Sequence, residues 1–240
     1  MTEQSITAVY AGTVCEKINM IAENQGNRIK EASKLLYHCK NNGGTIYSFG
    51  TGHSYMITQE IFARAGGYAG IIPVLENELS MAHPFKSTLI ERTAGYAEVI
   101  EGLYSFQAGD VIIMTSNSGR NQLIIELALR LKERGVKIIA VTAEEQSSLS
   151  AGRHPSGKRL FELADIVLDN YSDEGDASYT HSEEIRTAPT STITDVFLLH
   201  RMVSEFVQML IDTGVECPVF RSSNVDGSDA YNEELFTMYR

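Results

Sequence analysis

Five short apolar segments constrain the fold of this chain more than any other feature. They occupy residues 45–49, 70–75, 111–115, 137–142 and 165–169. Most of them are nearly continuous runs of apolar and β-branched residues, which is typical of strands that are buried on both faces of a sheet. A sheet made of such strands must be covered by helices on both sides.

Helical patterns separate these segments. The clearest one runs from Leu123 to Arg134, where leucine, isoleucine and alanine form an apolar stripe before the sequence "ERG" ends the helix. Residues 76–109 form a longer connection than one crossover helix needs, so we expect an additional turn or helix there. Strands that alternate with helices predict an α/β fold with a doubly wound sheet of five parallel strands, in the order 2-1-3-4-5.

The length of 240 residues and the hydrophobic content of 43% are enough for one substantial core, so we expect a single domain over residues 1–240. The expected parts are N-terminal helices over 1–42, an α/β core over 43–170, a long polar loop over 171–189, and a C-terminal helix and tail over 190–240. Asp195 lies three residues after Thr192 and is expected to complete a capping box at the start of that helix.

Charge and composition exclude several classes of protein. The formal net charge of −11 argues against a nucleic-acid partner, because such proteins present a basic face. The apolar runs are too short to cross a membrane, and the N-terminus has no signal-peptide pattern, so we expect a cytoplasmic protein with no membrane partner. The three cysteines are far apart and form no C-x-x-C pair, which favours free thiols.

Two loops rich in glycine and hydroxyl residues follow the first and third apolar segments. They read "GTGHS" over residues 50–54 and "TSNSG" over residues 115–119. In a sheet of this order, the carboxyl ends of these two strands flank the crevice in which ligands bind. Candidate ligand contacts in the two loops are Gly52, His53, Ser54, Thr115, Ser116, Asn117, Ser118 and Gly119.

The chemistry of these loops suits a phosphate monoester. Each loop runs into a helical pattern and places backbone N–H groups at a helix N-terminus, which favours an anion. Neither loop contains a lysine or a P-loop motif, so a nucleoside triphosphate is not indicated. A dinucleotide is disfavoured because Tyr55 replaces the third glycine of that fingerprint. The alternative is that the serines only cap their helices.

The pair "FGTGHS" and "MTSNSG", with "KIIAVT" as the next strand, resembles the sugar isomerase (SIS) domain of phosphosugar isomerases and phosphosugar-binding regulators. The resemblance covers roughly residues 45–170. Within that family the chain is similar to phosphoheptose isomerases, to N-acetylmuramic acid 6-phosphate etherases and to small bacterial SIS-domain proteins.

The resemblance implies a phosphosugar as the partner, bound through Ser54, Ser116 and Ser118. It also implies polar contacts from Thr190 and Ser191 at the start of the late helix. Homodimers or homotetramers with shared sites at subunit interfaces are implied as well. Arg120, next to the second loop, could pair with the phosphate or point to solvent.

Isomerisation of an aldose to a ketose needs a base, usually a carboxylate. The candidates are Glu60 on the helix after the first loop, Glu78 after the second strand, and His200 on the late helix. Each has a structural alternative, since exposed carboxylates are usually only solvated and a histidine on an apolar face is more often packed. Glu91 belongs to a segment that could close the site.

No metal and no cofactor are expected, because no group of His, Asp and Glu has the spacing of a preformed metal site.

From the two loops, the candidate bases and the family resemblance, we predict a phosphosugar-binding protein that acts as a sugar-phosphate isomerase by carboxylate-assisted proton transfer. Two alternatives stay open, a sugar-phosphate sensor without catalysis and a phosphosugar lyase of the etherase type.

Overall fold

The computed structural model describes residues 5–239 and contains a central sheet of five parallel strands in the order β2-β1-β3-β4-β5. In that order the strands are β2 (Ile71–Pro73), β1 (Ile46–Gly50), β3 (Val111–Thr115), β4 (Lys137–Thr142) and β5 (Ile166–Asp169). The expected fold class and strand order are confirmed. In the register of the sheet, Gly50 lies opposite Thr115, so the carboxyl ends of β1 and β3 are side by side.

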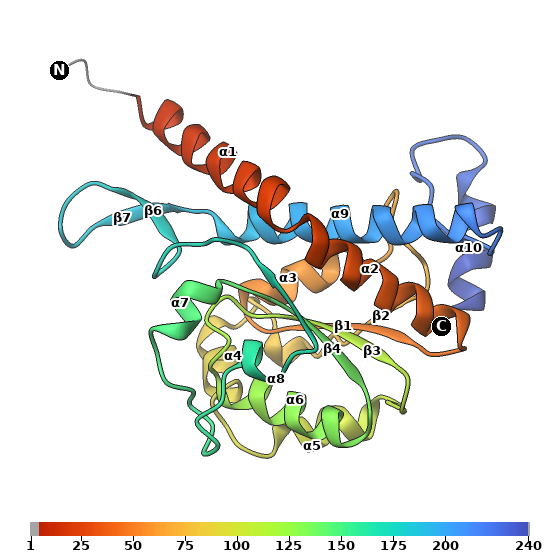
Figure 1. The fold of residues 1–240 in the computed structure, drawn as a ribbon, viewed down its shortest axis with the longest axis horizontal. Coiled ribbons are helices and arrows are strands. Elements are labelled where there is room, and N and C mark those ends of the chain that lie inside the picture. The colour runs from red at the N-terminus through yellow and green to blue at the C-terminus, as the bar shows by residue number, and fades with distance from the viewer. Residues whose placement is uncertain (1–4, 240) are drawn as a thin grey trace.

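Helices cover both faces of the sheet (Figure 1). One face packs against α2 (Gly26–Asn41) and α9 (Ser191–Asp212), with α1 (Ile6–Asn24) lying against these two helices. The other face packs against α5 (Tyr96–Leu103), α6 (Gln122–Glu133) and α8 (Leu160–Leu163). Alternate residues of β3 point to the two faces: Ile113 belongs to the first core and Ile112 to the second. Because both cores are apolar, the strands read as nearly continuous hydrophobic runs.

The connection between β2 and β3 carries the expected additional helices. It contains the short 3-10 helix η1 (Asn77–Leu79) and α4 (Pro84–Ile90) before α5. Three other helices complete the structure, namely α3 (His53–Glu60), α7 (Glu144–Ser148) and α10 (Ser228–Met238). The first two follow β1 and β4, so they begin at the carboxyl edge of the sheet.

The expectation of a loop over residues 171–189 is wrong in part. This segment contains an antiparallel hairpin of β6 (Ala177–Thr180) and β7 (Arg186–Pro189), which Figure 1 shows beside α1. Both strands are short and no residue of either is buried, so no apolar alternation marks them in the sequence. The Tyr10 hydroxyl of α1 donates a hydrogen bond to the Pro189 carbonyl at 2.6 Å and ties the hairpin to that helix.

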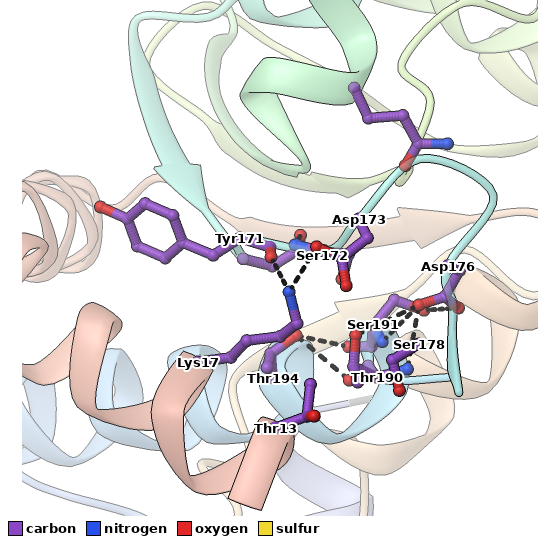
Figure 2. Close-up of polar contacts among 12 residues, drawn as sticks. Thr13, Lys17, Tyr171, Ser172, Asp173, Asp176, Ser178, Thr190, Ser191 and Thr194 are labelled. Carbon is purple, nitrogen blue, oxygen red and sulfur yellow. Dashed lines mark hydrogen bonds and ion pairs between the residues drawn. The ribbon is translucent and has the colours of Figure 1, made fainter. Parts of the chain in front are cut away.

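Lys17 joins α1 to the chain that follows β5. Its ammonium group donates to the Tyr171 carbonyl at 2.7 Å and pairs with the Asp173 carboxylate at 2.9 Å (Figure 2). Lys17 is only 6% exposed, so these partners replace most of its water. This contact fixes the segment that leads from the sheet to the start of α9.

Cys15, Cys39 and Cys217 are free thiols, as expected. Among residues 5–239, the helices are all too short or too polar to span a bilayer.

Candidate functional site

The two polar loops predicted from the sequence meet at one edge of the sheet. Residues 50–54 lead from β1 into α3, and residues 115–121 lead from β3 into α6. Since β1 and β3 are neighbours in parallel register, both loops and both helix N-termini face the same space. This is the switch point at which ligands bind in open parallel sheets.

Three glycines allow the tight turns of these loops. A Cβ atom at Gly50 would lie 2.4 Å from the Ser54 carbonyl oxygen, so only glycine fits there. Gly52 and Gly119 have φ angles of +60° and +56°, a region that side chains with a Cβ rarely adopt. The glycines of "GTGHS" and "TSNSG" therefore shape the loops.

The loops enclose a cavity of about 500 Å³. Its lining from the two loops and their helices consists of Thr51, Gly52, His53, Ser54, Ile57, Ser116, Asn117, Ser118 and Asn121. The remaining lining comes from other segments, namely Met81, Pro84, Ser87, Thr88, Glu91, Gln146, Gly175, Asp176, Ser191, Thr192 and Asp195. No lysine or arginine is among these residues, and the polar groups of the lining are mainly hydroxyls and amides, with His53 and three carboxylates.

The serine hydroxyls differ in how they are held. The Ser116 hydroxyl accepts a hydrogen bond from the Gly119 N–H at 3.2 Å and closes its own turn. In the part of the chain that the structure describes, the hydroxyls of Ser54 and Ser118 have no hydrogen-bond partner although both residues line the cavity. Ser54 and Ser118 are therefore the donors that are available to a ligand.

Asn117 is fixed by a chain of amide contacts. Its Nδ2 donates to Gln146 at 3.0 Å, and its Oδ1 accepts from Asn170 at 2.9 Å. Asn170 also donates to the Asp195 carboxylate at 2.7 Å. This chain links the second loop to α9, so the cavity wall is rigid at that point.

Asp195 is the most perturbed acid of the cavity. It is only 2% exposed, and burial raises its pKa from the ordinary 3.8 to about 7, with a further contribution from the charge of Asp176. The hydrogen bond from Asn170 acts in the opposite direction. The expected capping box is not formed, because the helix begins at Ser191 and Asp195 faces the cavity instead.

Asp176 caps α9 from the preceding segment (Figure 2). Its carboxylate accepts from the backbone N–H groups of Thr190 and Ser191 at 3.0 and 2.8 Å, and from the Ser191 hydroxyl at 2.6 Å. A carboxylate at a helix N-terminus satisfies free N–H groups and the helix dipole together. The N-terminus of α9 is thus capped by the carboxylate of Asp176.

Seven of the predicted ligand contacts line the cavity and three do not. Those on the cavity are Gly52, His53, Ser54, Ser116, Asn117, Ser118 and Ser191. The three that lie outside the lining are Thr115, Gly119 and Thr190. Thr115 and Thr190 are buried beneath the surface, and Gly119 shapes the turn. Contact with a ligand stays a prediction for all ten.

The predicted catalytic residues do not reach this cavity in the single chain. Glu60 and His200 lie together on α3 and α9, with His200 Nε2 at 3.3 Å from the Glu60 carboxylate, and Arg64 contacts both. Burial and the charge of Arg64 lower the pKa of His200. Glu78 pairs instead with Lys86 at 3.7 Å. A catalytic role of these three residues stays a prediction.

The carboxylates that do line the cavity, those of Glu91, Asp176 and Asp195, were not among the predicted catalytic residues. Glu91 lies at the end of α4 and accepts from the Thr51 hydroxyl of the first loop at 2.8 Å. Asp195 and Asp176 reach the cavity only because α9 and the hairpin fold back over the sheet edge. The one available signal was Asp195, the only acid in the first two turns of α9. No group of His, Cys, Asp and Glu among residues 5–239 is arranged to hold a metal ion.

The family model of the SIS domain matches residues 9–143, more than half of the chain. The chain belongs to the SIS domain family. Among relatives of this SIS-domain protein, the UPF0309 protein BH3325 of Halalkalibacterium halodurans is 40% identical over 92% of this chain and 93% of its own length. The UPF0309 protein OB3413 of Oceanobacillus iheyensis is 37% identical over 96% of this chain and 95% of its own length.

Solved structures share the fold of this SIS-domain protein. The phosphoheptose isomerase of Francisella tularensis superposes with a TM-score of 0.56 at 17% identity, over 84% of this chain and 96% of its own. The phosphoheptose isomerase GmhA of Neisseria gonorrhoeae gives a TM-score of 0.55 at 16% identity, over 83% of this chain and 96% of its own. At this level of identity the likeness concerns the fold.

Proposed function

We propose that this SIS-domain protein binds a sugar phosphate in the cavity between its two serine loops and interconverts its aldose and ketose forms. The observation that carries the proposal is the meeting of two free serine hydroxyls, those of Ser54 and Ser118, with the N-termini of α3 and α6. The names of the phosphoheptose isomerases that share the fold support the same ligand class.

The phosphate group fits the loop side of the cavity. Hydroxyl donors and the N–H groups at the start of a helix stabilise an anion without a fixed positive charge. The cavity of about 500 Å³ has room for a hexose or heptose in addition to the phosphate. The amides of Asn117 and Asn121 offer donors and acceptors to the hydroxyls of the sugar.

The proton transfer is assigned to Asp195. A carboxyl group whose pKa is about 7 can accept a proton and return it near neutral pH. In the proposed reaction Asp195 removes the proton from C2 of the aldose, which gives an enediol, and then protonates C1 to give the ketose. A proton moves from the oxygen on C2 to the oxygen on C1, and Glu91 is the second carboxylate available to assist it.

The test is a binding screen followed by an exchange measurement. Thermal shifts are recorded with hexose, heptose and N-acetylamino-sugar phosphates, and each binder is incubated in D2O while NMR follows deuterium incorporation at C2. We expect exchange in the wild type, loss of exchange in D195N with binding retained, and no change in E183Q, which alters an exposed carboxylate. Exchange that persists in D195N would overturn the assignment of the base.

The same screen separates the alternatives. Binding without exchange in the wild type would favour a sensor, and release of an ether substituent would favour a lyase. Stabilisation by dinucleotides alone would overturn the phosphosugar proposal. The cytoplasmic location and the homodimer or homotetramer stay predictions, and light scattering on the purified protein tests the second of them.

A further inference from the structure

Three arginines gather beside the cavity at the end of the second loop. Arg120 follows the loop directly, and its carbonyl accepts from the backbone N–H of Arg153 at 2.7 Å. The Arg153 guanidinium donates to the Asn121 side chain at 2.6 Å, and Asn121 lines the cavity. Arg92 follows Glu91, whose carbonyl accepts from the Leu123 N–H at 3.0 Å. We call Arg92, Arg120 and Arg153 the arginine cluster.

The arginine cluster differs from most other arginines of residues 5–239, which pair with a carboxylate. Arg130 and Arg134 both pair with Glu101, whereas no carboxylate among residues 5–239 lies within 4.0 Å of a nitrogen of the arginine cluster. The Nε atom of Arg120 is buried and has no hydrogen-bond partner within the same residues. The charges of Arg92 and Arg120 act on Arg153, so three arginines without a carboxylate partner in residues 5–239 lie near one another, although the chain has 31 acidic and 20 basic residues.

The electrostatic state of the cluster is unfavourable in the absence of an anion. Burial lowers the pKa of Arg153, and the charges of Arg92 and Arg120 lower it further. Glu91 acts in the opposite direction, but its carboxylate is held by the Thr51 hydroxyl. A ligand anion between these guanidinium groups would relieve the repulsion and satisfy the free N–H donors.

We propose that the arginine cluster binds a second anionic group of the ligand, a carboxylate or a second phosphate, while the first phosphate occupies the serine loops. This inference rests on the proposed function and narrows its substrate class to sugar phosphates with two anionic groups. Guanidinium groups suit this task because their planar fork matches the oxygen atoms of carboxylates and phosphates. Asn121 joins the two subsites, since it lines the cavity and holds Arg153.

The test compares three probes by calorimetry at fixed salt, namely glucose 6-phosphate, fructose 1,6-bisphosphate and 6-phosphogluconate. We expect at least one of the two probes with a second anionic group to bind the wild type about tenfold or more tightly than glucose 6-phosphate. R120Q and R153Q should both remove this gain. R120Q, whose side chain holds no residue of the cavity, should also leave the affinity for glucose 6-phosphate unchanged. The better of the two probes distinguishes a second phosphate from a carboxylate.

A matched control is R186Q, which alters an exposed arginine on β7 away from the cavity and should keep the gain. Thermal melting of each variant verifies that it is folded. Equal affinity of the wild type for all three probes, or a gain that persists in both R120Q and R153Q, overturns the inference while the proposed function stands. If none of the three probes and no phosphosugar of the wider screen binds, the proposed function and this inference fail together.

Discussion

The raised pKa of Asp195 leads to a prediction about the stability of the protein that does not depend on the identity of the ligand. The carboxyl group is buried, and its pKa is raised from 3.8 to about 7 in the folded protein. The folded state therefore binds a proton more tightly than the unfolded chain does. Stability from this group is fully present below pH 3.8 and is lost as the pH rises through about 7. Replacement by asparagine removes the ionisation and keeps the size of the side chain.

The size of this change in the free energy of unfolding follows from the difference between the pKa of Asp195 in the unfolded chain and that in the folded protein. Each pH unit in which the folded state holds the additional proton changes the free energy of unfolding by about 1.4 kcal/mol. From the ordinary value to about 7 the total is about 4 kcal/mol. The stability of D195N relative to the wild type should thus increase by roughly this amount between pH 4 and pH 8. Asp176 contributes through its charge, so the added D176N change should reduce the effect.

The assay is urea unfolding of the wild type and D195N at a series of pH values from 4 to 8. The control is E183Q, whose carboxylate is exposed and makes no ion pair within residues 5–239. We expect the difference between D195N and the wild type to grow with pH and that of E183Q to stay flat. Parallel stability curves for D195N and the wild type would refute the reasoning, because they would mean that Asp195 is ionised normally.

Three other substitutions test the structural basis of the site by urea unfolding. G119A places a Cβ in a backbone with φ of +56° and should cost about 1–2 kcal/mol, whereas G12A, on an open helix face, should be neutral or stabilising. K17M removes the donor to the half-buried Tyr171 carbonyl and should cost about 1–3 kcal/mol; an unchanged midpoint would contradict the role of this contact. D176A uncaps α9 and should cost about 1–2 kcal/mol, and a loss below a few tenths would show that water caps the helix as well.

Much of the fold could be predicted from the sequence because its signals are local. Strands buried on both faces leave apolar runs, and the stripe of α6 repeats at helical intervals. The loops at the switch point were also predictable, since Gly52 and Gly119 mark turns that require positive φ. The hairpin of β6 and β7 was not predictable, because its exposed polar strands leave no alternation.

The acids of the cavity could not be found in the same way. Whether Asp195 or His200 faces the cavity depends on the rotation of α9 about its axis, because five residues at 3.6 residues per turn place the two side chains about 140° apart around the helix. Glu91 is separated from Thr51 by forty residues, and only the folded chain brings them together. Tertiary packing determines which of these side chains face the cavity, and no periodic pattern in the sequence indicates that packing.

The central claim is that the serine loops hold a phosphate group, and calorimetry on loop variants tests it most directly. A sugar phosphate from the screen and the same sugar without phosphate are titrated into the wild type, S54A, S118A and the control S105A, an exposed serine outside the cavity. Each lost hydrogen bond to a charged group is worth about 1.5–3 kcal/mol, which is roughly a tenfold to hundredfold weaker affinity. We predict this loss in S54A and S118A, no loss in S105A, and no binding of the sugar without phosphate. Equal affinity of S54A, S118A and the wild type would contradict the account.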